Sequence, residues 1–163
     1  MSDEEEKTAL LSLFCIGSGD NTDISLEEKN QIQSFNKIID LKKYNYIIIP
    51  ETVKAIKIAE QYPSKAIIVH ENKLADRNFG NNYQYNDIYF NTLNGKPQNG
   101  ETAFNVYERV SVLWENLSSE INNNVLIYAY DWAFAALIAN IEDESPNFIL
   151  NRFKFGETAH YHI

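Results

Sequence analysis

The sequence predicts an α/β fold, a three-layer sandwich in which helices cover both faces of a mostly parallel central sheet. Two observations carry this prediction. Short, uninterrupted apolar runs are typical of strands that are buried on both faces, and segments with helical periodicity alternate with them along the chain. The length of 163 residues suits one domain. We therefore expect a single domain at residues 9–163, after a disordered acidic tail at residues 1–8.

Four apolar runs predict the strands. Gly17 follows the first run and Pro50 follows the second, and both residue types interrupt regular structure. One further strand is expected between residue 148 and the C-terminus. The four runs are ALLSLFCI at 9–16, YIII at 46–49, AIIV at 66–69 and VLIY at 125–128.

Four segments with apolar residues at helical spacing predict the helices. The first begins after Ser25, which is placed as an N-cap with Glu28 at the capping-box position, and it runs to about Asp40. The others are expected at 51–61, 101–120 and 131–141.

The segment 71–99 is rich in Asn, Tyr and Gly and has no clear period. It is too long for an ordinary connection, which indicates a functional or lid-like insertion. Its aromatic residues could form an interface with a partner or pack under the loop, and both interpretations stay open. These residues are Tyr83, Tyr85, Tyr89 and Phe90.

Composition excludes some functions. The net charge of -9 and the lack of a Lys/Arg-rich stripe argue against direct binding of nucleic acid. No apolar run approaches the ~20 residues that span a bilayer, so no membrane association is expected. The single cysteine, Cys15, cannot form an internal disulfide, and the acidic start is unlike a signal peptide. An intracellular, reducing location (cytoplasmic or nuclear) is expected.

Five segments, in order, resemble the histidine phosphatase (phosphoglycerate-mutase-like) superfamily over nearly the whole chain after residue 8. Residues 23–30 (DISLEEKN) resemble D-x-P-L-T-x-x-G, and residues 46–60 (YIIIPETVKAIKIAE) resemble S-S-P-L-x-R-A-x-x-T-A-E. Residues 74–80 (LADRNFG) resemble L-x-E-R-x-F-G, residues 100–110 (GETAFNVYERV) resemble G-E-S-x-x-D-V-x-x-R-V, and residues 125–131 (VLIYAYD) stand where the family has V-L-V-V-S-H-G.

The resemblance implies phosphoryl transfer through a nucleophilic histidine, with arginines and a second histidine around the phosphate and a carboxylate as general acid. This chain departs from that pattern, because neither histidine is present at the matching positions. We expect a vestigial pocket that is near neutral or negative and binds phosphate poorly. Its residues are Cys15, Ile16 and Gly17 at the R-H-G position, Lys54 for the arginine, Asp76 for the general acid with Arg77 beside it, Tyr130 for the second histidine and Asp131 for the following glycine.

The function predicted from this loss is a catalytically inactive, pseudophosphatase-like protein that acts as a binding, scaffolding or complex subunit. Protein partners are expected, either a second copy or a larger complex, and no cofactor or metal. The alternative is an enzyme or small-molecule binder, including a sensor, with a repurposed carboxylate/tyrosine pocket in place of the phosphohistidine site.

The candidates to substitute for the missing histidines are the chain's three histidines and its cysteine. His70 ends a predicted strand, and a surface histidine is its simpler interpretation. His160 and His162 would share one face of a strand, which is half of a metal site without a third ligand. For Cys15, a buried structural thiol is favoured over a nucleophile. The turn at 17–22 lacks the lysine and glycine spacing of a phosphate-binding loop.

Overall fold

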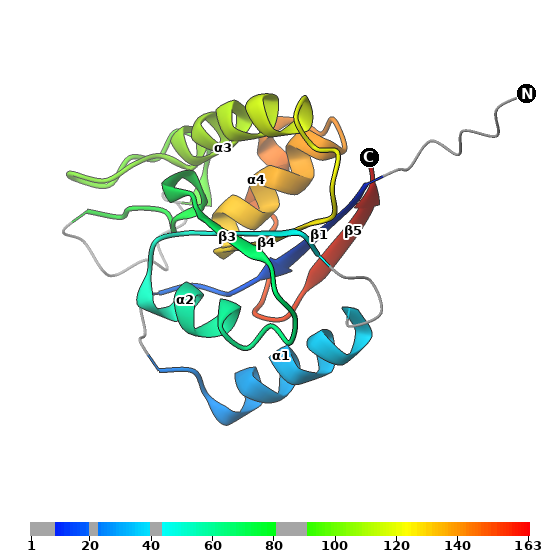
Figure 1. The fold of residues 1–163 in the computed structure, drawn as a ribbon. Coiled ribbons are helices and arrows are strands. Elements are labelled where there is room, and N and C mark those ends of the chain that lie inside the picture. Colours follow the sequence, from blue (N-terminus) through cyan, green and yellow to red (C-terminus); the bar gives the residue numbers. More distant parts are fainter. Residues whose placement is uncertain (1–8, 20–22, 40–43, 81–90) are drawn as a thin grey trace, which may run out of the picture.

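The computed structural model describes residues 9–19, 23–39, 44–80 and 91–163, and it shows a sheet between two layers of helices (Figure 1). Helices α1 (Leu26–Ile39) and α2 (Val53–Ala59) lie on one face. Helices α3 (Ala103–Ser118) and α4 (Asp131–Ile141) lie on the other. The predicted α/β sandwich is confirmed.

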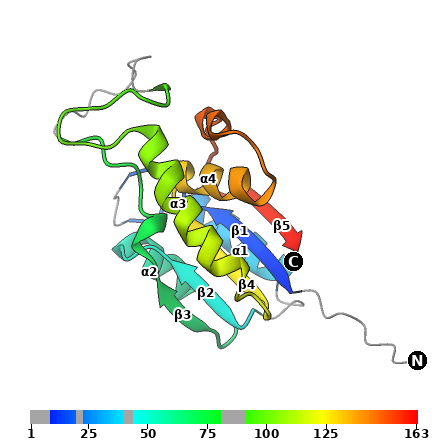
Figure 2. The ribbon, with the colours of Figure 1, turned by 90° about the horizontal axis from the view of Figure 1, so that it is seen from above.

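The sheet has five strands in the order β3-β2-β4-β1-β5, with β3 and β5 at its two edges (Figure 2). All neighbouring pairs are parallel except β5, which runs antiparallel to β1. The further strand expected near the C-terminus is β5, whereas part of the run at 148–155 lies in a short 3₁₀ helix, η3 (Pro146–Leu150). The strands are β1 (Leu10–Cys15), β2 (Tyr46–Ile49), β3 (Ile67–His70), β4 (Val125–Ala129) and β5 (Thr158–His162).

Strands β1 and β4 form the centre of the fold, because every residue of both is buried. Their side chains alternate between the two faces, as the pleat requires. Leu11 and Leu13 pack with α3 and α4, whereas Leu10 and Phe14 pack with α1 and α2. The uninterrupted apolar runs in the sequence are thus the signature of strands covered on both sides.

Side-chain caps fix the starts of α1 and α2. The capping box predicted at α1 is present: Ser25 Oγ accepts from the backbone N–H of Glu28 at 3.1 Å, and Glu28 accepts from that of Ser25 at 3.0 Å. At α2 the N-cap is Thr52, so this helix is shorter than the predicted 51–61. No helix in the described segments is long and apolar enough to cross a membrane.

The insertion begins with a 3₁₀ helix, η1 (Asn72–Leu74), and the backbone around Gly80 lies against the backbone around Gly100. A Cβ on Gly80 would stand 2.0 Å from the carbonyl oxygen of Gln98. The aromatic residues of the insertion, between 81 and 90, lie outside the described residues, as does the acidic tail at 1–8. The predictions for these segments stay predictions.

Replacing Gly80 with alanine is expected to destabilise the fold by at least about 2 kcal/mol, because its φ of +69° is strained for an L side chain and the new methyl group would clash with backbone. The matched control is Gly19→Ala, which has a φ of +85° and no atom within 4 Å of the added Cβ. We expect the control to lose only about 1 kcal/mol. Urea denaturation measures both losses, and equal losses would contradict the close approach of the backbone at Gly80 to that at Gly100.

Candidate functional site

The carboxyl ends of β1 and β4 lie side by side and bring the predicted pocket residues together. The N–H of Ile16 donates to the carbonyl of Ala129 at 2.9 Å, and the N–H of Asp131 donates to the carbonyl of Gly17 at 2.9 Å. In open α/β sheets, ligands bind outside this edge. The candidate site is therefore built on the residues that follow these two strands.

Lys54 extends from the first turn of α2 toward the end of β1, and its side chain is only 5% exposed. Its Nζ lies 5.4 Å from the ring centroid of Phe155 and 6.0 Å from that of Tyr130. In the described chain its one carboxylate partner is Glu28, at 3.8 Å. A nearly buried ammonium with one distant counter-ion is costly, and a closer anion would offset the cost.

Tyr130, at the position that the resemblance gives to the second histidine, is fully buried. Its hydroxyl shares a hydrogen bond of 2.9 Å with Thr52 Oγ1, and Thr52 also caps α2. The phenol is therefore held between the end of β4 and the start of α2.

Asp131 is also buried, at 3% exposure. One carboxylate oxygen accepts from the N–H of Trp132 at 2.8 Å, and the other accepts from Arg152 at 2.5 and 3.1 Å. Burial raises the pKa of Asp131, while Arg152 and, more weakly, Lys54 oppose the rise. The ion pair with Arg152 keeps this buried carboxylate from being an isolated charge.

Trp132 lies between two guanidinium groups. Arg77 is 4.7 Å and Arg152 is 4.6 Å from its ring centroid. Arg77 also donates to the backbone carbonyls of Gly95 and Glu101, and burial lowers its pKa to about 10. Within the described residues the buried indole N–H of Trp132 has no hydrogen-bond acceptor, which is an uncommon and costly state for a buried donor.

Asp76 reaches the same edge from the insertion. Its Oδ2 accepts from the N–H of Gly19 at 2.9 Å, in the loop after β1, and Oδ1 accepts from the N–H of Arg77 at 2.9 Å. The carboxylate is half-buried. It therefore joins the insertion to the end of β1.

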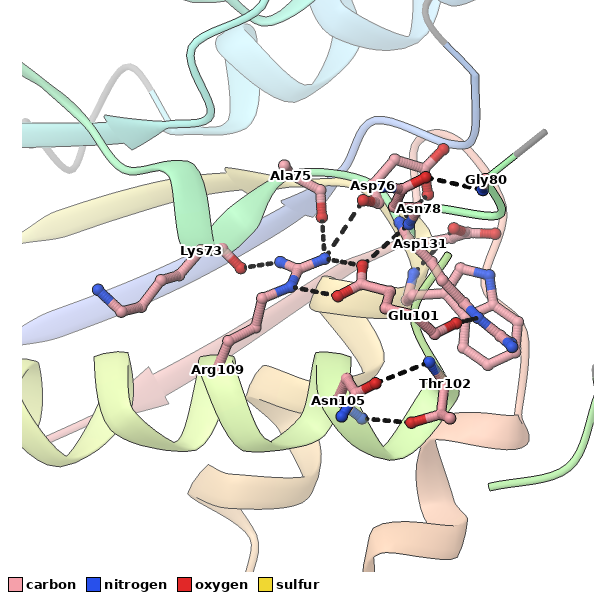
Figure 3. A network of polar contacts seen from close by, with 12 residues as sticks. Lys73, Ala75, Asp76, Asn78, Gly80, Glu101, Thr102, Asn105, Arg109 and Asp131 are labelled. Carbon is pink, nitrogen blue, oxygen red and sulfur yellow. Dashed lines mark hydrogen bonds and ion pairs between the residues drawn. The ribbon is translucent and has the colours of Figure 1, made fainter. Parts of the chain in front are cut away.

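Arg109 and Glu101 hold the backbone around Asp76 (Figure 3). The guanidinium of Arg109 donates to the carbonyls of Lys73, Ala75 and Asp76, and it forms a bidentate pair with the carboxylate of Glu101. Glu101 in turn accepts from the N–H of Asn78 at 2.9 Å. Such charge-assisted forks fix geometry strongly, so Arg109 positions the carboxylate of Asp76 by holding the backbone of that residue.

Cys15 is buried on the α3–α4 side of the sheet, and burial raises the pKa of its thiol to about 12. Burial therefore disfavours the thiolate, which is the nucleophilic form of cysteine. Cys15 lies in the core, where the interpretation of a buried structural thiol expects it.

The three histidines all lie on the two edge strands of the sheet. His70 ends β3 and is exposed, whereas His160 and His162 share one face of β5, as predicted. His160 hydrogen-bonds Ser12 at 2.7 Å and stacks on Phe35, on the α1 side of the sheet. Among the described residues, no three His, Cys, Asp or Glu side chains gather as a metal site would need.

The sequence prediction placed Lys54, Asp76, Tyr130 and Asp131 at this edge, and the structure brings them there. The sequence prediction missed four residues that complete the site. None of the four stands at a catalytic position of the family motifs. Arg152 and Phe155 come from the irregular segment before β5, where no periodicity pointed to them. The missed residues are Glu28, Thr52, Arg152 and Phe155.

With this geometry established, comparison with known proteins defines the class of fold. No protein-family model matches the chain, and no curated protein matches it in sequence. Solved structures do match it, and they give the chain a phosphoglycerate-mutase-like fold.

Three such structures illustrate the likeness. A putative alpha-ribazole-5'-P phosphatase from Escherichia coli has a TM-score of 0.80 at 16% identity, over 94% of this chain and 89% of its own. Alpha-ribazole phosphatase from Shigella flexneri has 0.77 at 17% identity, over 93% and 89%. YhfR from Bacillus stearothermophilus has 0.77 at 15% identity, over 93% and 90%.

These comparisons overturn the prediction of a catalytically inactive scaffolding or complex subunit. Structures of phosphatases share the fold over about nine tenths of their own length, and nothing in the described geometry marks the chain as a scaffold. The prediction counted missing histidines, but it did not foresee that other charged and polar side chains converge at the same edge of the sheet.

A pH-dependent effect is expected for Asp131→Asn. Burial raises the folded-state pKa of this carboxyl. The protonated carboxyl therefore favours the folded state at acidic pH, and this contribution to the unfolding free energy is lost as the pH rises through the folded-state pKa. Asparagine has no such titration. The unfolding free energy of the variant relative to wild type should therefore increase between about pH 3 and about pH 7.

Urea denaturation at several pH values measures this difference. Glu144→Gln, at an exposed acid that follows α4, is the control for removing one surface carboxylate. A relative stability of Asp131→Asn that falls as the pH rises would show that the pairing with Arg152 outweighs burial.

Proposed function

We propose that the protein binds a small molecule at the carboxyl edge of its sheet, in a pocket where Lys54, Tyr130 and Asp76 take the place of a phosphohistidine site. The main observation behind this proposal is the environment of Lys54. Its side chain is 5% exposed, and the nearest described carboxylate lies 3.8 Å from its ammonium. Natural proteins tolerate such local costs chiefly at functional sites. The buried, unmatched N–H of Trp132, two residues after Tyr130, is a second polar group of this kind among the described residues.

The charge of the pocket favours a ligand group with one negative charge. Arg152 is neutralised by Asp131 at 2.5 Å, and Arg77 is engaged by two backbone carbonyls. Lys54 is then the cation left to meet a ligand, and one ammonium suits a carboxylate better than a doubly charged phosphate. We therefore propose a small carboxylate-bearing molecule as the ligand.

The absence of both family histidines belongs to the same proposal. Ile16 and Tyr130 occupy the positions after β1 and β4 that the resemblance gives to them. The pocket would thus work without a covalent phosphohistidine. Incubation with p-nitrophenyl phosphate, followed by mass spectrometry, is expected to detect no phosphohistidine; such an adduct on any of the three histidines would contradict the proposal.

Acid–base catalysis in this pocket is a second candidate function. Asp76 is half-buried, and its backbone is clamped by the pair of Arg109 and Glu101. A carboxylate that is held at the same edge of the sheet as Tyr130 and Lys54 offers a group for proton transfer.

Thermal-shift measurements with a panel of small carboxylates, and with inorganic phosphate, test the binding function. A carboxylate at about a hundred times its Kd should stabilise the wild type by about 2.7 kcal/mol. Lys54→Met should abolish this shift without destabilising the free protein by more than about 1 kcal/mol, because it removes a nearly buried charge and leaves Glu28 partly exposed.

The matched control is Lys57→Met, which removes an exposed lysine from the same helix and should keep the shift. An equal shift in Lys54→Met and wild type would contradict the assignment of Lys54.

For acid–base catalysis, the second candidate function, Asp76→Asn should remove any turnover of the bound molecule while the thermal shift that this molecule causes persists.

A further inference from the structure

Two Asn-Gly pairs lie toward the end of the insertion, at Asn94-Gly95 and Asn99-Gly100. An asparagine followed by glycine is the sequence in which a side-chain amide reacts most readily with its own backbone, because glycine has no Cβ to block the approach. Both asparagines are exposed. The sequence therefore allows the same reaction at both pairs, and the local structure distinguishes them.

The reaction replaces a neutral amide by a carboxylate and so adds a negative charge. The backbone nitrogen of the glycine loses its proton and attacks Cγ of the asparagine. A succinimide ring forms as the bond from Cγ to the amide nitrogen breaks and ammonia leaves. Water then opens the ring at one of its carbonyls, which gives aspartate or isoaspartate. In isoaspartate the main chain runs through the former side chain and is longer by one carbon.

The backbone nitrogen that would attack at Asn99 is held in place. The N–H of Gly100 donates to the carbonyl of Pro97 at 3.0 Å, so this bond must break before the nitrogen can attack. Gly100 is also closely packed, because a Cβ there would lie 2.7 Å from the carbonyl oxygen of Asn78. The N–H of Glu101 donates to that same carbonyl at 2.7 Å. The peptide after Asn99 therefore cannot rotate toward its side chain without breaking several contacts.

The equivalent nitrogen at the first pair is not held in this way. Within the described residues, the N–H of Gly95 has no hydrogen-bond acceptor. Residues 94–97 belong to no helix or strand, so no ladder fixes the peptide between Asn94 and Gly95. Attack on the side chain of Asn94 thus begins without the loss of a backbone hydrogen bond, whereas attack on that of Asn99 does not.

We propose that Asn94 is a site of spontaneous conversion to aspartate and isoaspartate, whereas the fold protects Asn99 from the same reaction. The hydrogen bond of Gly100 alone should slow the reaction at Asn99 about tenfold, since the net free energy of such a bond is added to the barrier. The reactants are the chain and water, so no enzyme is required.

The conversion acts on Arg77 through the carbonyl of Gly95. Nη2 of Arg77 donates to that carbonyl at 3.0 Å in a buried contact. An isoaspartate at position 94 lengthens the main chain directly before Gly95 and so displaces the carbonyl. Arg77 is 3% exposed and lies 4.7 Å from the ring centroid of Trp132, where a weakened partner is costly. A change at an exposed residue therefore reaches the buried guanidinium that follows Asp76.

Peptide mapping of the aged full chain tests the site. The protein is incubated at mildly alkaline pH, which favours loss of the backbone proton, and is then digested with trypsin. Trypsin does not cleave between Lys96 and Pro97, so both asparagines fall on one peptide, and fragmentation in the mass spectrometer distinguishes them. In the folded protein, Asn94 is expected to convert at least about tenfold faster than Asn99.

The same chain unfolded in guanidinium chloride is the control, because it has both Asn-Gly pairs without the hydrogen bond of Gly100. Asn94 and Asn99 should then convert at similar rates. Equal rates in the folded protein, or faster conversion of Asn99, would overturn the proposal. So would an Asn94 that stays unmodified in the folded protein while both asparagines convert after unfolding.

Urea denaturation of the separated products tests the effect on Arg77. Anion exchange isolates the converted protein, and labelling with an isoaspartate-specific methyltransferase identifies the isoaspartate form. Its folding equilibrium constant should be about tenfold lower than that of Asn94→Asp, since a hydrogen bond from a charged group to Gly95 is weakened. Asn94→Asp is the matched control, because it has the same charge and an unchanged main chain. Equal unfolding free energies of the two forms would overturn the effect on Arg77.

Discussion

The parallel pairing of β1 with β4 is the constraint on which the rest of the structure depends. Both strands are buried along their whole length, so neither can shift by one residue without turning its apolar side chains to the wrong layer. The same pairing places the carbonyl of Gly17 against the N–H of Asp131. Every group of the candidate site is positioned relative to that junction.

Buried charge is the second organising feature, and it follows from the first. Lys54, Arg77 and Asp131 all lie at the edge of the sheet with little exposure, where an unmatched charge is expensive. Asp131 is matched by Arg152, and Arg77 by backbone carbonyls and two aromatic rings. Lys54 has a more distant counter-ion than Asp131, at 3.8 Å. For this reason the proposed ligand is placed at Lys54 and not at the arginines.

Much of the fold could be predicted from the sequence because local patterns agreed with the global arrangement. YIII at 46–49 and the helix at 131–141 begin and end where they were expected, since Pro50 and the end of the apolar pattern mark them. The site could be predicted only in part. Lys54, Asp76 and Tyr130 followed from a motif, but Arg152 and Phe155 lie in an irregular segment that only tertiary folding brings to the pocket. The inference of an inactive protein, drawn from the family motifs, was wrong for the same reason, since a motif lists positions and does not show which other side chains meet there.

The β3 edge and the candidate site are connected through a short stretch of chain. Glu71 follows β3 directly, caps η1, and η1 leads to Asp76. Arg109 binds the carbonyls of Lys73, Ala75 and Asp76, so the segment is attached to α3, the helix that carries the arginine. At the far end of this segment, the Asp76 carboxylate accepts from the N–H of Gly19. Asp76 is therefore held by its carbonyl oxygen from Arg109 and by its carboxylate from the loop after β1, and these two contacts together fix its position at the candidate site.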